Sequence, residues 1–208
     1  MSDFGIIGIG RIGTSMARNM SSKGIIVSLY DKSHNSLAKL KSDYPELESS
    51  LVFDDIYKFI SSITKPRKVL VLVPSGPALD EVISLLIQYL DSNDILIDGG
   101  NTNPNVSFEN HQTIKSKNLL YLGMGVSGGV KGVLEGPSIM IGGDTNAFDQ
   151  VKNIFSQITS KTINGSKSFE FFGDSNQGHF VKMIHNGIEY VEMQLISCLL
   201  YTSPSPRD

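Results

Sequence analysis

The chain has 208 residues, and 40% of them are hydrophobic, which is enough to bury the core of one domain with an appendage. Its net charge of −3, with lysines and arginines scattered along the chain, argues against a nucleic-acid partner. Cys198 is the only cysteine, so an internal disulfide is excluded; with neither an apolar run of about 20 residues nor a basic leader, we expect a cytoplasmic protein without a membrane anchor.

The first elements follow the order strand, glycine turn, helix, strand. Phe4 to Ile7 predicts a short buried strand, and a helical pattern runs to about Ser21. A second strand, Ile25 to Tyr30, ends at Asp31, about 20 residues after the glycines. This spacing is typical of the dinucleotide-binding βαβ unit. The turn itself consists of Gly8, Ile9, Gly10, Arg11, Ile12 and Gly13.

The three glycines of the turn have separate predicted roles. Gly8 permits the tight turn, Gly10 lets the backbone approach a pyrophosphate, and Gly13 lets the helix pack closely on the strand. The N-terminus of the helix faces the bound anion. The alternative is a glycine-rich turn that binds no ligand.

Asp31 bears on the choice of cofactor. Its carboxylate can accept hydrogen bonds from an adenosine ribose 2′-hydroxyl, whereas a 2′-phosphate would meet a like charge, which favours NAD. Lys32 and Ser33 follow directly and could contact a phosphate if the loop turned Asp31 aside, so NADP stays open.

Helices and strands continue to alternate along the chain, which predicts a mostly parallel sheet. Asp144 is expected to cap the helix between the last two strands. The predicted elements are a helix near Asp54 to Ser62, a strand Val69 to Val73, a turn at Pro74 to Pro77, a helix to about Leu90, and strands Ile95 to Ile97, Leu119 to Leu122, Ser138 to Ile141 and Phe169 to Phe172.

Two glycine-rich loops follow strands at the edge of the sheet where ligands of open α/β folds bind. The first, Asp98 to Asn103, lets Asn101 approach a ligand. The second, Gly125 to Val130, exposes consecutive N–H groups at Ser127, Gly128 and Gly129, which suit a carboxylate or a phosphate. Either loop could instead be a chain reversal without a ligand.

The segment from Gly178 to Tyr190 predicts a helix with one chemically diverse face. Lys182, His185, Asn186 and Glu189 recur at helical spacing and place an amine, an imidazole, an amide and a carboxylate together. The opposite face is apolar and is expected to pack on a core. It consists of Phe180, Ile184, Ile188 and Val191. The alternative is that the polar stripe only faces water.

Taken together, these motifs resemble the N-terminal part of the 6-phosphogluconate dehydrogenase family, from about Phe4 to Ser197. The wider β-hydroxyacid dehydrogenases typically have paired asparagines where His185 and Asn186 stand. The resemblance implies an α/β, Rossmann-like, doubly wound and mostly parallel sheet, followed by the start of a long helix that leads to an all-α domain missing here. It divides the chain into a cofactor domain at residues 1–174, the first helix of the helical domain at 175–197, and a doubtful tail at 198–208.

What the resemblance implies for the residues is specific. Lys182 would be the general base and Glu189 the general acid. The phosphorylated sugar acid would lie among Asn101, Ser127, Gly128, Gly129, His185, Asn186 and Tyr190. The nucleotide would lie against Gly8, Ile9, Gly10, Arg11, Ile12, Gly13, Asp31, Lys32, Ser33, Val73, Pro74, Ser75 and Asn101. The complete enzyme would form a homodimer or a higher oligomer.

The chain departs from the NADP-dependent pattern of the family, which has an Asn-Arg-Thr type sequence in place of Asp31, Lys32 and Ser33. The turn at 10–13 together with Asp31 is closer to the NAD-using branch. The segments Gly136-Pro137-Ser138 and Met193-Gln194-Leu195-Ile196 are closer to the NADP-using branch. The cofactor is therefore expected to be NAD or NADP, with NAD favoured by Asp31.

No metal is expected, because His34, His111, His179 and His185 form no i, i+4 pair and no cluster with cysteine. Pro204 and Pro206 should end the last helix, and we expect a truncated reading frame with an unrelated tail. Two other functions stay open: a different β-hydroxyacid dehydrogenase, such as one acting on 3-hydroxyisobutyrate, and a non-catalytic nucleotide-binding module. The 208 residues alone are expected to bind NAD or NADP with negligible turnover.

Overall fold

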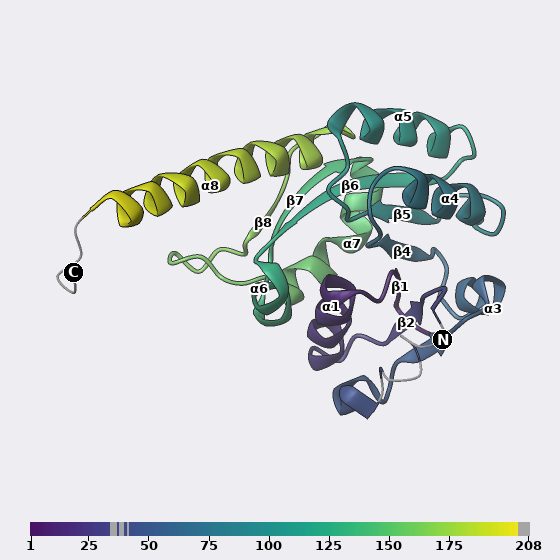
Figure 1. The fold of residues 1–208 in the computed structure, drawn as a ribbon. Helices are drawn as coiled ribbons and strands as arrows, with labels where there is room; N and C mark the ends of the chain where they lie inside the picture. Colours follow the sequence, from purple (N-terminus) through teal and green to yellow (C-terminus); the bar gives the residue numbers. More distant parts are fainter. Residues whose placement is uncertain (34–36, 38–39, 41, 204–208) are drawn as a thin grey trace.

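The computed structural model describes residues 1–33, 37, 40 and 42–203. An eight-stranded sheet with the order β3-β2-β1-β4-β5-β6-β7-β8 forms the centre of the molecule, and helices cover both of its faces (Figure 1). All neighbouring strands pair in parallel except β6 and β7, which are antiparallel. The predicted doubly wound, mostly parallel sheet is therefore confirmed.

The strands are β1 (Phe4–Ile7), β2 (Val27–Tyr30), β3 (Leu51–Phe53), β4 (Lys68–Val71), β5 (Ile95–Asp98), β6 (Leu120–Ser127), β7 (Ser138–Gly143) and β8 (Phe169–Phe171). The helices are α1 (Arg11–Ser22), the 3-10 turn η1 (Pro45–Leu47), α3 (Ile56–Ser61), α4 (Pro77–Leu86), α5 (Pro104–Lys115), α6 (Gly129–Glu135), α7 (Thr145–Ile158) and α8 (Gln177–Thr202).

Two hydrophobic cores lie on the two faces of the sheet. Ile6 packs in one of them with Met16 of α1 and Phe155 of α7. The next residue, Ile7, points to the opposite face and packs with Phe59 of α3. Strands that bury both faces need apolar residues at successive positions, which explains the short continuous apolar runs of β1, β4 and β5. Each fully buried side chain of this size contributes about 1.5–3 kcal/mol.

Strand β1 lies at the point where the direction of the strand order changes. Its neighbours are β2 on one side and β4 on the other. After β1 the chain adds β2 and β3 on one side, and it then crosses over to add β4 on the other side of β1. The loops that follow β1 and β4 therefore separate and leave a crevice at the carboxyl edge of the sheet.

Several elements differ from the prediction. Strand β6 continues to Ser127, so the first half of the predicted glycine loop, residues 125–127, is sheet, held by antiparallel pairing with β7. Asp144 stands at the N-cap of α7, but its carboxylate accepts from the Tyr121 N–H (2.8 Å) and makes no cap hydrogen bond. Helix α8 includes Cys198 and continues to Thr202, two residues before Pro204. Strand β3 and helices α5 and α6 were not predicted from the sequence pattern.

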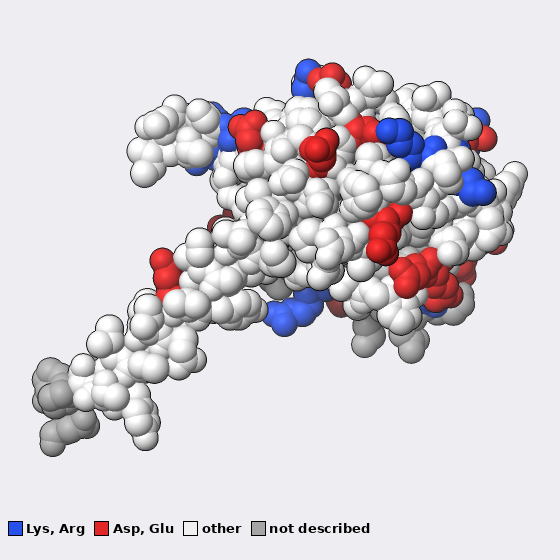
Figure 2. Space-filling model, turned by 90° about the horizontal axis from the view of Figure 1, so that it is seen from above, with Lys and Arg blue, Asp and Glu red and all other residues white. Residues whose placement is uncertain are grey.

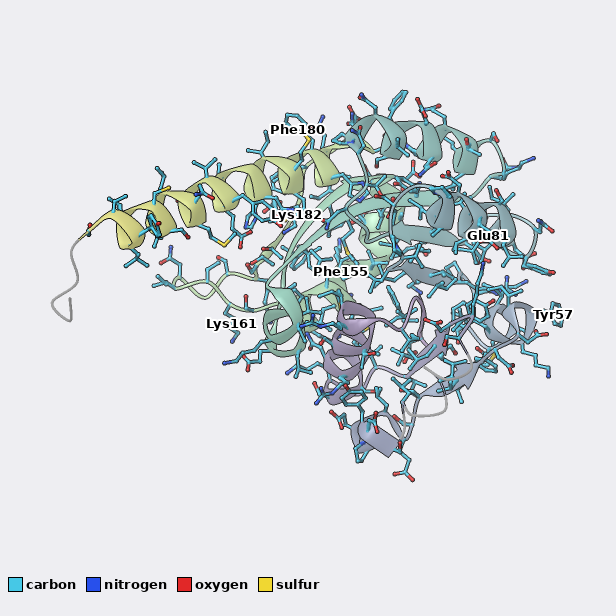
Figure 3. The ribbon with its side chains drawn as sticks, in the orientation of Figure 1. Tyr57, Glu81, Phe155, Lys161, Phe180 and Lys182 are labelled. Atoms are coloured by element: carbon cyan, nitrogen blue, oxygen red, sulfur yellow. The ribbon has the colours of Figure 1, made fainter. Side chains whose placement is uncertain are left out.

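The orientation of α8 is the largest difference. Lys182 and His179 are 8% and 2% exposed, whereas Phe180 and Ile184 on the apolar face are 44% and 48% exposed. Figure 3 shows Lys182 on the side of α8 that faces the sheet and Phe180 on the outer side. The predicted packing of the apolar face on the core is wrong. Of the polar stripe, Lys182 is buried, whereas the Glu189 side chain is 52% exposed.

The second half of α8 extends away from the sheet (Figure 1), and its surface is mostly free of charged side chains (Figure 2). Despite its length, α8 lacks the apolar character of a membrane span, and no other helix in the described part of the chain has it.

Candidate active-site cleft

A cleft of about 1390 Å³ lies at the carboxyl edge of the sheet. It is bordered by the turn after β1, the segment after β4, the loop after β5, the end of β6 with the start of α6, and one face of α8. Ligands of doubly wound sheets bind at this edge beside the switch point, so position alone makes the cleft the candidate site.

The cleft brings together most of the residues predicted from the sequence: Gly10, Arg11, Ile12, Gly13, Val73, Pro74, Ser75, Asn101, Ser127, Gly128, Gly129, Lys182, His185, Asn186, Glu189 and Tyr190. Five others lie outside its lining, namely Gly8, Ile9, Asp31, Lys32 and Ser33. Sequence reasoning missed Ile188 and Glu192, although Glu192 lies three residues after Glu189 and helical spacing could have indicated it.

The glycine turn has the steric features that a dinucleotide requires. Gly8 has φ +92°, and a Cβ at Gly13 would lie 1.9 Å from the Gly8 carbonyl oxygen, so the predicted turn and close packing at these two positions are confirmed. A Cβ at Gly10 would meet nothing within 4 Å. The backbone at Gly10 is therefore open toward the cleft at the N-terminus of α1, where an anion is favoured, and these residues fit a pyrophosphate.

Asp31 is held in place by the turn, although it lies outside the cleft lining. Its carboxylate accepts hydrogen bonds from the N–H groups of Ile9 (2.8 Å) and Ser33 (2.8 Å). Lys32 pairs with Glu81 of α4. The two backbone donors fix the carboxylate against the glycine turn, and Asp31 is not turned aside.

Helix α8 packs directly on the backbone of β6 and β7 at four glycines, which we call the glycine seat: Gly123 and Gly125 of β6, Gly142 of β7 and Gly178 of α8 itself. From Tyr121 on, the residues of β6 that face α8 are Gly123, Gly125 and Ser127, while the alternate residues are apolar and face the opposite core. A Cβ at Gly125 would lie 2.4 Å from the Lys182 Cβ, and one at Gly178 would lie 2.2 Å from the Gly123 carbonyl oxygen. The sequence carried this signal as a period of two in residues 120–127.

Burial changes the acidity of Lys182. Removal of the ammonium group from water lowers the pKa of Lys182, and the negative charge of Glu189 acts in the opposite direction but is the smaller effect. The net lowering makes the neutral amine, which can accept a proton, more accessible than in an exposed lysine.

Ser127 and His185 connect the end of β6 to α8 across the cleft. The Ser127 Oγ lies 3.3 Å from the His185 Nε2. The other ring nitrogen, Nδ1, lies 3.4 Å from the Asn186 Oδ1 and 3.6 Å from the Glu189 Oε2. A hydroxyl, an imidazole, an amide and a carboxylate therefore form one polar wall next to Lys182, with donors and acceptors suited to a ligand that carries several hydroxyl groups.

Within the described residues, no three His, Cys, Asp or Glu side chains gather as metal ligands would. His34, one of the four histidines considered for a metal, lies outside those residues.

The fold and the cleft together define a dinucleotide-binding domain of the Rossmann type. The family model for the NAD binding domain of 6-phosphogluconate dehydrogenase matches residues 3–166, and the model for the C-terminal domain of that enzyme matches residues 178–201. The chain belongs to the 6-phosphogluconate dehydrogenase family.

Relatives with curated names share this assignment. The decarboxylating 6-phosphogluconate dehydrogenase of Staphylococcus epidermidis is 39% identical over 193 residues, which are 93% of this chain and 41% of that protein. Enzyme 1 of Saccharomyces cerevisiae is 38% identical over 195 residues, covering 94% of this chain and 40% of the relative. The chain thus spans about two fifths of the length of these relatives.

Solved structures agree with the fold. Plasmodium falciparum 6-phosphogluconate dehydrogenase, which was determined without ligands, with NADP+ and with 6-phosphogluconate, has a TM-score of 0.89 at 37% identity and covers 94% of this chain and 42% of that one. The 3-hydroxyisobutyrate dehydrogenase of Mycobacterium tuberculosis has a TM-score of 0.79 at 19% identity, covering 94% and 62%, which shows the shared fold alone.

Proposed function

We propose that this chain forms the cofactor half, and part of the substrate site, of an enzyme that oxidatively decarboxylates 6-phosphogluconate to ribulose 5-phosphate and CO2. The observation that supports it most strongly is the buried Lys182 in the same cleft as the open Gly10 backbone. The family relatives carry the name of this activity.

The nucleotide would be held by the turn at 8–13, by Asp31 to Ser33, by residues 73–75 and by Asn101. When bound, its nicotinamide ring supplies the acceptor for a hydride. Lys182 accepts the proton of the substrate hydroxyl as the hydride leaves, since its lowered pKa makes the neutral amine available.

Lys182 then serves the second half of the reaction as an acid. Its ammonium donates a hydrogen bond to the new 3-keto oxygen, which stabilises the charge that develops as CO2 departs and an enediol forms. Glu189, two helical turns further along α8, protonates the carbon that lost CO2. Ser127, Gly128, Gly129, His185, Asn186 and Tyr190 bind the sugar acid in the cleft.

NAD is the proposed cofactor. The Ile9 and Ser33 N–H groups fix the Asp31 carboxylate, and Lys32 is paired with Glu81, so a 2′-phosphate would meet an immobile like charge. We further propose that the protein acts in the cytoplasm, needs no metal, and works as a homodimer or a higher oligomer.

Calorimetric titration of the 208-residue chain tests the cofactor assignment. We expect NAD to bind at least about tenfold more tightly than NADP, a difference of about 1.4 kcal/mol. Asp31→Asn should reduce the difference in affinity between NAD and NADP while keeping an acceptor for a backbone N–H. Asp31→Ala should also weaken NAD binding. Tighter binding of NADP to the parent chain would refute the NAD assignment.

The activity is tested on the native protein purified from its source. We expect NAD-dependent release of CO2 from 6-phosphogluconate and no comparable oxidation of 3-hydroxyisobutyrate. Preference for 3-hydroxyisobutyrate would assign the protein to the wider superfamily activity, and cofactor binding without any turnover would indicate a non-catalytic module.

A further inference from the structure

A network of buried, hydrogen-bonded polar groups lies beneath the cleft and is not part of its lining. His179 stands one turn before Lys182 on α8, and its ring contacts two other elements. The Nδ1 atom lies 2.9 Å from the Ser107 Oγ of α5, and the Nε2 atom lies 3.2 Å from the main-chain carbonyl oxygen of Asp98 at the end of β5. His179 therefore joins α8 to the strand that leads into the Asn101 loop.

The directions of these hydrogen bonds follow from the donors available. A carbonyl oxygen only accepts, so the His179 Nε2–H must donate to Asp98. Burial lowers the pKa of His179, which favours the neutral ring, and Nδ1 then accepts from the Ser107 hydroxyl. The Tyr121 hydroxyl lies 3.0 Å from the Ser107 Oγ and 3.3 Å from the Asp98 Oδ2, so its single proton can be donated to either oxygen. Burial also raises the pKa of Tyr121 well above its usual value, so this hydroxyl keeps its proton.

At the other end of this hydrogen-bond network, Asp98 shapes the loop that lines the cleft. Its carboxylate is fully buried and accepts from the Gly100 N–H (3.0 Å) and from the Thr102 hydroxyl (2.7 Å). These two bonds enclose Asn101, which faces the cleft. Asp98 thus holds the Asn101 loop with its side chain and is itself held to α8 through its carbonyl oxygen.

We propose that His179 is a positioning residue that fixes the distance between Lys182 and the Asn101 loop through its Nε2–H bond to the Asp98 carbonyl. This inference rests on the proposed function for the meaning of Lys182 and Asn101, but not for the structural link. Without the bond, the glycine seat still admits α8, but among residues 1–33, 37, 40 and 42–203 no other polar contact sets how far its first turn lies from the end of β5. Lys182 would then move toward solvent and lose part of its desolvation.

Long-range ¹H–¹⁵N NMR of the histidine rings tests the assigned directions in the parent chain. We expect His179, identified by loss of its signals in His179→Gln, to be neutral at pH 7 with the proton on Nε2. A neutral ring protonated on Nδ1 at this pH would overturn the proposal, because Nε2 would then have no proton to donate to the Asp98 carbonyl oxygen.

Two matched substitutions test the consequence for Lys182. In His179→Gln the side-chain amide reaches the position of Nε2 and can still donate to Asp98, whereas in His179→Asn the amide reaches only the position of Nδ1. The readout is acetylation of Lys182 as a function of pH, followed by peptide mass spectrometry and normalised to the exposed Lys131 in the same sample.

We expect His179→Asn to raise the pH midpoint of Lys182 acetylation and His179→Gln to leave it near that of the parent. Equal midpoints in all three folded proteins would show that His179 contributes stability alone, and the proposal would fail. This measurement needs neither nucleotide nor sugar acid, so it distinguishes failure of the link from failure of the proposed function. If His179→Asn does not fold, the NMR result on the parent still decides the matter.

Discussion

Two regions of the cleft are built on glycine, and they use it in opposite ways. In the turn at 8–13, two glycines bring β1 and α1 into contact, and Gly10 leaves the backbone open to the cleft. In the seat beneath α8, which consists of Gly123, Gly125, Gly142 and Gly178, each absent side chain is replaced by atoms of the protein itself. The first region makes room for a ligand and the second makes room for the helix that carries Lys182.

The difference explains how a polar helix face can be buried. Large side chains on β6 and β7 would keep α8 at an ordinary packing distance of about 10 Å. With glycine on both sides, backbone approaches backbone, and only the side chains at the contact are enclosed. Lys182 and His179 are therefore buried by geometry and not by hydrophobicity, while Phe180 and Ile184 stay exposed.

Lys182→Met separates the two regions most sharply. The glycine seat is proposed to position the base, Lys182, and the glycine turn to bind the nucleotide. In Lys182→Met, turnover of 6-phosphogluconate by the native protein should therefore fall by at least about a hundredfold, while nucleotide affinity stays within about twofold. Steady-state kinetics and calorimetry measure the two quantities. Lys131→Met on α6, an exposed lysine, is the matched control. Substantial remaining oxidation in Lys182→Met would exclude Lys182 as the base.

Gly178→Ala tests the seat itself. The new Cβ would lie 2.2 Å from the Gly123 carbonyl oxygen, so the helix must move or the strand must bend. We expect the free energy of unfolding to fall by about 3 kcal/mol, at the upper end of the usual effect of overpacking. Gly187→Ala on the same helix meets nothing within 4 Å, and it should instead raise stability by about 1 kcal/mol through helix propensity. Urea unfolding of the two variants compares them directly, and equal effects would disprove the close contact.

Gly10→Ala probes the open side of the comparison. A Cβ there meets no atom of the protein, and Gly10 has φ −74°, so the free energy of unfolding should change by less than about 0.5 kcal/mol. The same methyl group would stand where the pyrophosphate approaches, and NAD affinity should fall by about tenfold, or 1.4 kcal/mol. Gly13→Ala is the contrasting variant, because its Cβ collides with the Gly8 carbonyl oxygen and should reduce stability first. Unchanged affinity in Gly10→Ala would place the nucleotide elsewhere.

The sequence predicts the turn well and the seat poorly, for a physical reason. The positive φ of Gly8 and the contact of Gly13 with the Gly8 carbonyl oxygen are set within a few residues of the turn, so spacing along the chain contains this information. The seat joins Gly125 to Lys182 and Gly178 to Gly123 across more than fifty positions, and no local spacing reports such a contact. Glycine or serine alternates with apolar residues toward the end of residues 120–127, which indicates a strand with one glycine-lined face, but we interpreted these glycines as a loop.

The orientation of α8 could not be predicted from helical periodicity. Periodicity identifies two faces but does not say which one is buried, and the apolar face is the usual choice for the core. Here the glycines of β6 and β7 decide, and they belong to a different part of the chain. The same applies to His179, whose partners Ser107 and Asp98 lie 72 and 81 residues away.

Asp144→Asn tests a contact at the start of β6, the strand that carries Gly123 and Gly125, and it should have the smallest effect on stability. Burial alone would raise the pKa of Asp144, but hydrogen bonds from His111 (3.1 Å) and from the Tyr121 N–H (2.8 Å) outweigh it, and the pKa is lowered. Because the folded pKa lies below the unfolded value of about 3.9, this stabilisation is fully present above pH 4 to 5 and is lost as the pH falls through the folded pKa.

The difference in unfolding free energy between the parent and Asp144→Asn should therefore be constant near neutral pH and shrink below about pH 4. Urea unfolding between pH 3 and 7 measures it, with Glu135→Gln on α6 as an exposed control. His111 stacks on Tyr121, whose hydroxyl meets Ser107. A loss of stability in Asp144→Asn that grows toward low pH would contradict the charge of Asp144 as the stabilising feature and leave only its hydrogen-bond geometry to support β6 under α8.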